Sequence, residues 1–196
     1  MTAARTISSR IISRTLVYDG WYKFYRLEVE MPDGVVVERH LLDNGSAVAV
    51  LPYDPVRRVC MLIDQPRAGV LDAGEPPLLE AIAGNLDGTS PEARIVEEAF
   101  EEGGLRISDL EPVTNMWSLC PASTERVQLY LAQYAHEDRI AAGGGAHDED
   151  ENITVHEIGL DALRDMALCG ELSDAKTLIL AQALLLKHPQ LWADRR

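Results

Sequence analysis

Hydrophobic and polar positions near the start of the chain follow a pattern typical of β-strands. The segment WYKFYRLEVE, residues 21–30, is rich in aromatic and β-branched residues, and Pro32-Asp33-Gly34 after it is a turn signal. Residues 35–42, VVVERHLL, have the composition of a returning strand, so the pattern predicts a β-hairpin. We therefore expect residues 1–45 to form an N-terminal strand or hairpin region, followed by a main domain over 46–196.

Short strand-like segments separated by turn residues continue through the rest of the chain. The predicted strands cover residues 47–51, 59–63, 78–83, 105–117, 126–134 and 153–158. A stretch with Gly and Pro, residues 68–77, predicts a loop, and the glycine-rich acidic run AAGGGAHDEDE at 141–151 predicts another. That acidic run can also be interpreted simply as a solvated surface loop.

Three segments have helical patterns. Residues 91–102 form the best of them, because Ser90 can cap the helix, Pro91 suits its first position and Gly103-Gly104 can end it. Further helices are expected over 160–168 and 175–187. Many short strands with a few helices favour an α+β or α/β domain with a sheet between helices, rather than a doubly wound Rossmann domain.

Charge and cysteine content exclude several classes of protein. Eighteen Lys and Arg residues against 32 Asp and Glu give a formal net charge of -14, which disfavours binding to nucleic acid or to an anionic membrane. The sequence has no apolar run of about 18 residues and no secretory signal pattern. Its three cysteines show no paired spacing, so a cytoplasmic location is expected.

The helix over 91–102 carries an unusual group of acids near its end. With about 100° per residue, placing Glu97 at zero puts Glu101 near 40°, Glu98 near 100° and Glu102 near 140° on the helical wheel. Like charges at this spacing repel, with no Lys or Arg among them to compensate, and the helix dipole opposes anions in the last turns. The residues expected on the opposite, core side are Ala93, Val96, Ala99 and Phe100. A hard divalent cation bound to these carboxylates would remove the conflict. The alternative is a core helix whose solvated face is acidic.

Residues 84–105, GNLDGTSPEARIVEEAFEEGGL, resemble the Nudix box, GX5EX7REUXEEXGU. The match is best over 98–105, and the preceding EAIAG at 80–84 is similar to the E-x-P-A-G run of nucleoside diphosphate sugar pyrophosphatases. The segments QPR at 65–67 and GELSDAKT at 170–177 resemble the GDP-mannose pyrophosphatase branch, near the ADP-ribose pyrophosphatases.

This resemblance implies a fold, a reaction and an assembly. The fold would be a Nudix α/β/α sandwich with a mixed sheet, whose N-terminal hairpin exchanges with or packs on a second subunit to form a homodimer. The reaction would be Mg²⁺-dependent hydrolysis, with Mn²⁺ as a possible substitute, of the pyrophosphate bond of a nucleoside diphosphate sugar such as GDP-mannose or ADP-ribose. The products would be a nucleoside monophosphate and a sugar phosphate.

The resemblance also implies roles for individual residues. Glu98 and Glu102 would be the main metal ligands, with Glu101 as a ligand or supporting catalytic carboxylate and the Ala83 carbonyl as a further ligand. The general base would come from the acidic loop, where the candidates are Glu149 and Glu151.

Four further residues are candidates for binding the substrate. Arg67 would contact a phosphate or the sugar, although an exposed arginine at a strand end is an equally good interpretation. Trp21 and Tyr22 would stack on the base, unless they are packing groups of the hairpin. Glu125 would assist a metal ion.

The sequence departs from the Nudix pattern at one chemically important place. The pattern's arginine, which helps to orient a metal-binding carboxylate, is Glu97 in this chain, and Asp64 adds another acid near Arg67. The alternative hypothesis is therefore a catalytically impaired Nudix-fold module that binds a nucleotide or regulates a partner. A structural protein with an acidic surface is a third possibility.

Overall fold

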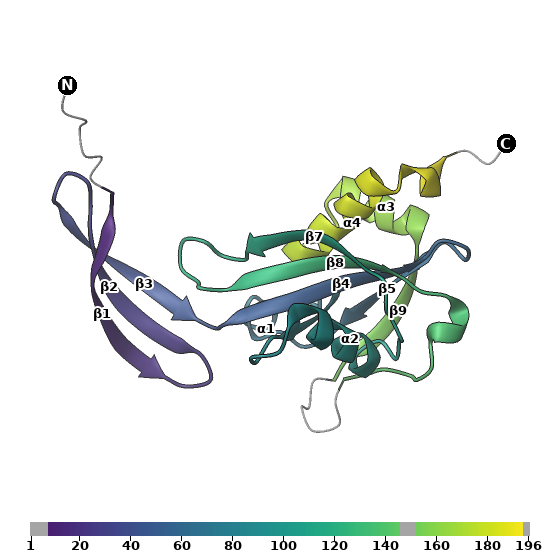
Figure 1. Cartoon of the computed structure of the whole chain (residues 1–196), viewed down its shortest axis with the longest axis horizontal. Helices are drawn as coiled ribbons and strands as arrows, with labels where there is room; N and C mark the ends of the chain where they lie inside the picture. Colours follow the sequence, from purple (N-terminus) through teal and green to yellow (C-terminus); the bar gives the residue numbers. More distant parts are fainter. Residues whose placement is uncertain (1–7, 146–151, 194–196) are drawn as a thin grey trace. The chain divides into compact units, whose positions relative to one another are not determined.

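The computed structural model describes residues 8–145 and 152–193, which form two compact units. One unit contains the chain up to Ser46 together with Trp117–Arg126, and the other contains Ala47–Met116 and the chain from Val127 onward. Most strands and helices of the two units are labelled in Figure 1.

The first unit is built on a three-stranded antiparallel sheet. Its strands are β1 (Arg10–Asp19), β2 (Lys23–Glu30) and β3 (Val36–Asp43), in the order β1-β2-β3. The turn between β2 and β3 contains Gly34 at a φ of 83°, a conformation that favours glycine. The predicted hairpin is thus confirmed, whereas β1 is a strand that the sequence pattern did not identify.

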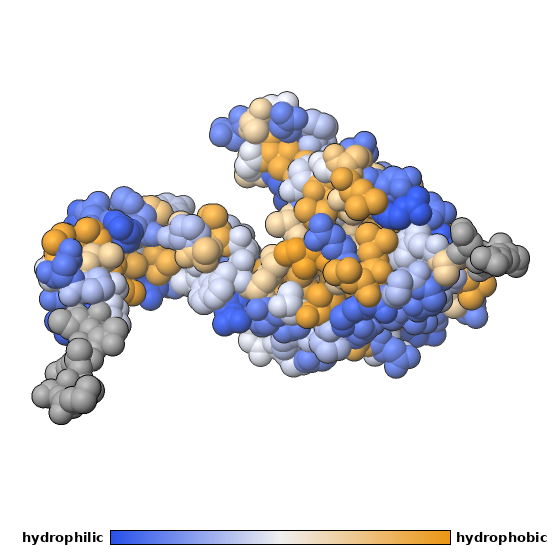
Figure 2. Space-filling view, turned by 90° about the horizontal axis from the view of Figure 1, so that it is seen from above, coloured by the Kyte–Doolittle hydropathy of each residue, from blue (hydrophilic) through white to orange (hydrophobic). Residues whose placement is uncertain are grey.

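Large apolar side chains of this sheet are exposed. Trp21, in the turn between β1 and β2, is 86% exposed. Figure 2 shows hydrophobic residues at the surface of the unit that carries the N-terminal residues. The exposed apolar residues of strand β1 are Ile11, Ile12, Leu16, Val17 and Tyr18.

The second unit contains a six-stranded sheet. Its strands are β4 (Ser46–Asp54), β5 (Val59–Asp64), β6 (Ile82–Asn85), β7 (Leu110–Trp117), β8 (Arg126–Gln133) and β9 (Thr154–Gly159). The order is β7-β8-β4-β5-β9, with β6 paired to β4. The pairings of β4 with β5, of β4 with β6 and of β5 with β9 are antiparallel.

Helices cover both faces of this sheet. The helices are α1 (Ala68–Asp72), α2 (Pro91–Glu101), α3 (Leu160–Cys169) and α4 (Ala175–Lys187), with short 3-10 helices at His136–Asp138 and Pro189–Trp192. Within the described residues, none of the helices is long and apolar enough to cross a bilayer.

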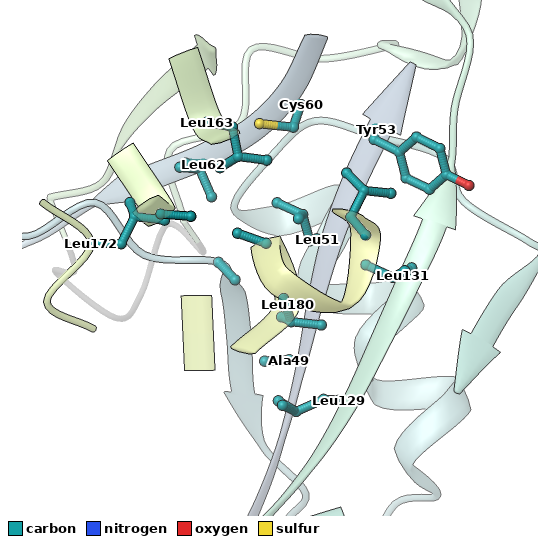
Figure 3. Packing of buried hydrophobic residues seen from close by; sticks show 14 of the residues in the cluster. Ala49, Leu51, Tyr53, Cys60, Leu62, Leu129, Leu131, Leu163, Leu172 and Leu180 are labelled. Carbon is teal, nitrogen blue, oxygen red and sulfur yellow. The ribbon is translucent and has the colours of Figure 1, made fainter. Parts of the chain in front are cut away.

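The alternation of side chains along β4 divides the core into two layers. Ala49 and Leu51 belong to the cluster with α3 and α4, which is shown in Figure 3. Val48 and Val50 belong to the opposite cluster, with Ile95 of α2. Because a strand buried on both faces must be apolar at every position, this arrangement explains the continuous apolar run in β4. The expected α/β/α sandwich is confirmed.

Several expected boundaries are wrong in detail. The stretch 68–77, predicted to be a loop, contains the short helix α1. The strand expected over 78–83 is displaced to β6, since Glu80 makes only an isolated bridge with Ile63 before regular pairing with β4 begins. The strand expected to start at residue 105 starts at Leu110, because Leu105 instead bridges to the distant Arg139.

Candidate functional site

Helix α2 begins at Pro91, as its sequence predicts, and ends at Glu101, one residue before the expected end. The Ser90 hydroxyl accepts a hydrogen bond from the backbone N–H of Ala93 at 3.3 Å, and Pro91 occupies the first position, where its missing N–H costs nothing. After the helix, Gly104 has a φ of 67°, which a residue with a side chain rarely adopts.

Burial separates the four acids of this helix. Glu98 and Glu102 are buried, Glu101 is partly buried and Glu97 is exposed. The simple wheel was wrong about Phe100, which we expected on the core side and which is 49% exposed. Burying an ionised carboxylate is costly unless it has polar or charged partners, so Glu98 and Glu102 need a specific environment.

That environment is the backbone at Ala83 and Gly84 in strand β6. The N–H of Ala83 donates a hydrogen bond to Oε2 of Glu102 at 3.0 Å. The carboxylate of Glu98 lies against Gly84 so closely that a β-carbon there would be 1.5 Å from Oε1 of Glu98. The structure therefore brings together Ala83, Glu98 and Glu102, three of the four predicted metal-binding residues.

Two carboxylates at one backbone segment match the way in which Mg²⁺ is usually held. Mg²⁺ is commonly bound through one or two carboxylates, with water and substrate phosphates as its other ligands. Over the described ranges, no three His, Cys, Asp or Glu side chains are grouped closely enough to hold a metal alone. Glu98 and Glu102 thus fit the carboxylate part of such a site.

Arg94 is a member of this site that our sequence reasoning missed. Its Nη2 lies 2.6 Å from Oε1 of Glu98, and its Nη1 lies 3.4 Å from Glu97 and 3.6 Å from Glu101. The expectation that the acids have no basic partner is therefore wrong. The signal was present in the sequence, because Arg94 precedes Glu98 by four residues and residues at this spacing meet on a helix.

Arg67, which was predicted to bind the substrate, forms a bidentate ion pair with Glu80. Arg67 donates to the two carboxylate oxygens of Glu80 through Nε at 2.9 Å and Nη2 at 3.0 Å, and Lys176 also donates to Glu80. Burial lowers the pKa of Arg67, but the hydrogen bond with Glu80 and the charges of Glu80 and Glu102 outweigh it and raise that pKa. Arg67 therefore interacts electrostatically with the buried acids Glu80 and Glu102. Its side chain is 41% exposed.

The GELSDAKT segment connects this charged group to helix α4. Asp174 caps the helix by accepting from the N–H of Thr177 at 3.0 Å, and it also pairs with Lys176 at 3.0 Å. The buried Thr177 hydroxyl accepts from the N–H of Ala81 at 2.6 Å. These contacts tie the start of α4 to the chain just before Ala83. In the sequence alone, this segment is only a point of resemblance to the family.

His156 and Asp64 form a separate pair. The Nε2 of His156 lies 2.7 Å from Oδ2 of Asp64, across the paired strands β5 and β9. Asp64, which departs from the family pattern, therefore has a partner on the neighbouring strand.

The remaining predicted site residues are not among these contacts. Trp21, Tyr22 and Glu125 belong to the first unit, where Glu125 accepts a hydrogen bond from the side chain of Asn44 at 3.0 Å. Glu149 and Glu151, the candidates for the general base, lie outside the described residues.

Comparison with known proteins gives the family of the chain. No family model matches it. It is 37% identical over 159 residues to a GDP-mannose pyrophosphatase of Cronobacter sakazakii, covering 79% of this chain and 82% of the relative. It is 31% identical over 185 residues to a GDP-mannose pyrophosphatase of Enterobacter sp. strain 638, covering 91% and 96% respectively.

A solved structure supports the same fold. The crystal structure of an ADP compounds hydrolase superposes with a TM-score of 0.73 over 94% of this chain and 98% of that chain, at 18% sequence identity. With buried acids at the end of a Nudix-like helix and relatives that match over most of their length, the chain belongs to the GDP-mannose pyrophosphatase family of Nudix hydrolases.

Proposed function

We propose that the chain hydrolyses the pyrophosphate bond of a nucleoside diphosphate sugar. GDP-mannose, which would yield GMP and mannose 1-phosphate, is the first candidate, and ADP-ribose is the near alternative. The observation that carries the proposal is the convergence of the buried Glu98 and Glu102 carboxylates on the backbone of Ala83 and Gly84. The names of the relatives from Cronobacter and Enterobacter support this choice of substrate.

In this proposal Mg²⁺, or Mn²⁺ in its place, is held by Glu98 and Glu102, with Glu101 and the Ala83 carbonyl as further ligands. When bound, the cation supplies positive charge for the pyrophosphate and Lewis acidity at the reacting centre. The protein's part is to hold the carboxylates in place. The N–H of Ala83 does this for Glu102, and Arg94 does it for Glu98.

Arg67 is the proposed contact for a phosphate or the sugar. Its pairing with Glu80 through two nitrogens fixes the plane of the guanidinium, and Lys176 in turn holds Glu80. A guanidinium oriented in advance loses less entropy when it binds an anion. We expect Arg67→Lys to raise the KM for the nucleotide sugar more than it lowers kcat.

The remaining roles rest on the resemblance alone. Glu149 or Glu151 is the proposed general base, Trp21 and Tyr22 are the proposed base-stacking residues, and Glu125 is the proposed auxiliary metal contact. For the base, the test is the pH dependence of kcat in Glu149→Gln and Glu151→Gln. Loss of the acidic limb of the profile in one variant would identify the base.

We also propose a homodimer formed through the sheet β1–β3. The exposed apolar residues of β1 support a second copy of this chain as the occupant, because a strand with so much apolar surface is rarely left in water. Sedimentation velocity tests this: Ile11→Asp with Val17→Asp should give monomers, whereas Thr15→Asp, also on β1, should not.

The free thiols of Cys60, Cys120 and Cys169 support a cytoplasmic location.

The test of the proposed reaction is product analysis by ion-exchange chromatography. The purified protein is incubated with Mg²⁺ and separately with GDP-mannose, ADP-ribose, ADP-glucose and NADH. We expect GMP or AMP to be released, and Glu102→Gln or a chelator to abolish the release. Glu97→Gln, on the exposed part of the same helix, is the matched control and should retain activity. Survival of every substrate would refute the proposal.

The alternative function is a module that binds a nucleotide without cleaving it. The observation that favours it is the ion pair between Arg94 and Glu98, which already provides Glu98 with a cationic partner. Calorimetry separates the two functions: tight nucleotide binding with no released product in the same sample would support the module. Turnover that depends on Glu102 would exclude it.

A further inference from the structure

In the Nudix pattern, an arginine lies beside the acids near the end of the helix that corresponds to α2 and helps to orient a metal-binding carboxylate. At that arginine's place this chain has Glu97, which brings a fourth acid into a group with Glu98, Glu101 and Glu102. The last turn of α2 contains no basic residue, and the helix dipole there opposes negative charge. Repulsion alone would push the carboxylates apart, and a metal site needs them held in place.

Arg94, one turn earlier, occupies the position from which a cation can reach these acids. On the wheel that places Glu97 at zero, Arg94 falls near 60°, between Glu101 near 40° and Glu98 near 100°. Its side chain is only 20% exposed and that of Glu98 is 7% exposed, so the 2.6 Å contact between them is shielded from water. The contacts of Arg94 with Glu97 and Glu101 are longer, at 3.4 and 3.6 Å.

The same atom of Glu98 is contacted from two sides. Oε1 receives Nη2 of Arg94, and Oε1 is also the atom that lies in the space left by the missing side chain of Gly84. The arginine therefore holds the carboxylate against the backbone that also binds Glu102 through the N–H of Ala83. This position of Arg94 is energetically unfavourable in one respect, because its Nε is buried without a hydrogen-bond partner among the described residues.

We infer that Arg94 is a positioning residue that performs, from one turn earlier in α2, the task of the arginine that is replaced by Glu97. It fixes the Glu98 carboxylate against Gly84 and offsets the charges of Glu97 and Glu101, so that the metal-binding carboxylates are arranged before a cation arrives. This inference rests on the proposed function, since it assigns a purpose to Arg94 within that site. It does not make Arg94 a catalytic residue, because its contacts are with carboxylates.

The size of the effect follows from the behaviour of residues that orient metal ligands. Replacing such a residue typically costs about 10- to 100-fold in metal affinity or activity. We expect Arg94→Ala to weaken Mn²⁺ binding by this factor and to lower kcat at limiting metal. At saturating metal, the KM for the nucleotide sugar should stay unchanged. Arg94→Lys, which keeps the charge without the planar fork, should fall between Arg94→Ala and the native protein.

The decisive variant restores the arginine of the Nudix pattern. In the double variant Arg94→Ala with Glu97→Arg, the cation is moved to the position that the pattern prescribes. If Arg94 acts by positioning Glu98, the double variant should recover most of the Mn²⁺ affinity that Arg94→Ala loses. Binding is measured by electron paramagnetic resonance of Mn²⁺ with the whole chain, so this measurement does not depend on turnover.

Arg164→Ala is the matched control for removing a helical arginine. Arg164 lies in α3 and pairs with Asp161 and Asp165, so the substitution removes comparable helix contacts away from α2. It should leave Mn²⁺ binding unchanged. Thermal unfolding of each variant shows how much of any loss is due to destabilisation.

The outcomes separate this inference from the proposed function. If the native protein hydrolyses a nucleotide sugar and Glu102→Gln abolishes this, but Arg94→Ala changes neither Mn²⁺ affinity nor rate, the inference alone is wrong. A gain of Mn²⁺ affinity in Arg94→Ala would also overturn it, since Arg94 would then be a competitor of the metal. If no substrate is cleaved but Mn²⁺ binding depends on Arg94 and is rescued by Glu97→Arg, the proposed function fails and the inference stands. A native protein that binds no Mn²⁺ would refute both.

Discussion

The carboxylate of Glu98 occupies the space in which a side chain on Gly84 would lie. A β-carbon added to Gly84 would come within 1.5 Å of Oε1 of Glu98. Glycine is needed here for close approach of helix α2 to strand β6, since the φ of Gly84 lies outside the left-handed region. The glycine that opens the Nudix-like segment is thus in direct contact with one of the acids near its end.

Gly84→Ala should therefore displace Glu98 and impair metal binding and hydrolysis. We expect at least a tenfold loss of kcat at limiting Mg²⁺, because a shift of a ligand by about 1 Å is enough to cost that much. Steady-state rates over a Mg²⁺ titration provide the measurement. Gly159→Ala, where an added β-carbon meets nothing within 4 Å, is the control and should behave as the native protein does. Equal rates in the two variants would contradict the assigned contact.

Thr177→Val should destabilise the fold by removing two hydrogen bonds of the hydroxyl, one accepted from Ala81 and one donated to Asp174. The substitution keeps the shape of the side chain but leaves the N–H of Ala81 without its acceptor in a buried place. An unsatisfied buried donor costs about 1–3 kcal/mol in the free energy of unfolding. Urea denaturation measures this cost. The same substitution at the exposed Thr15 should cost less than about 0.5 kcal/mol.

Glu80 should make the stability of the protein sensitive to acid. Burial alone would raise the pKa of Glu80, but its hydrogen bonds and charge interactions with Arg67 and Lys176 outweigh burial and hold that pKa below the ordinary 4.5. A carboxyl whose pKa falls on folding contributes stability that is complete above its unfolded pKa and is lost as the pH drops through the folded value. The contribution of Glu80 is therefore complete at pH 7, begins to fall as the pH drops to about 4.3, and is lost at lower pH as Glu80 is protonated in the folded protein.

Glu80→Gln tests this linkage. At pH 7 the variant should be less stable by about 3 kcal/mol, since two cations lose their buried partner. The difference from the native protein should shrink steadily in urea denaturation series taken from pH 5 to pH 3. Glu75→Gln, at an exposed position, is the control and should show no such trend. A constant difference across this range would show that the ionised form of Glu80 is not what stabilises the network.

The three cysteines should differ sharply in reactivity. Cys120 and Cys169 are exposed, whereas Cys60 is buried in the core beneath α3, where burial raises the pKa of its thiol to about 12. The thiolate is the reactive form, so Cys60 should be inert in the folded protein. A disulfide reagent at pH 8 should modify two thiols quickly and the third only after unfolding. In Cys60→Ala the number of rapidly modified thiols should remain two, and a number of one would contradict this assignment.

The sequence by itself determined those features that depend on residues close together in the chain. The alternation over 21–42 predicted the hairpin, and the Ser90, Pro91 and Gly103-Gly104 signals predicted the ends of α2, since turns and helix caps are local interactions. The Nudix-like spacing identified Glu98 and Glu102 for the same reason. The basic partner Arg94 was also within local reach, and it was missed because the acids and the apolar residues were placed on the wheel but Arg94 was not.

Only the tertiary structure decided which of these acids are buried and what surrounds them. The contacts of Glu102 with Ala83, of Glu80 with Lys176 and of Thr177 with Ala81 join residues that are 19, 96 and 96 positions apart. A pattern of neighbouring residues contains no information about such pairs. They form because the sheet brings strand β6 beside both α2 and the start of α4, and because a buried charge is stable only where the whole fold supplies its partners.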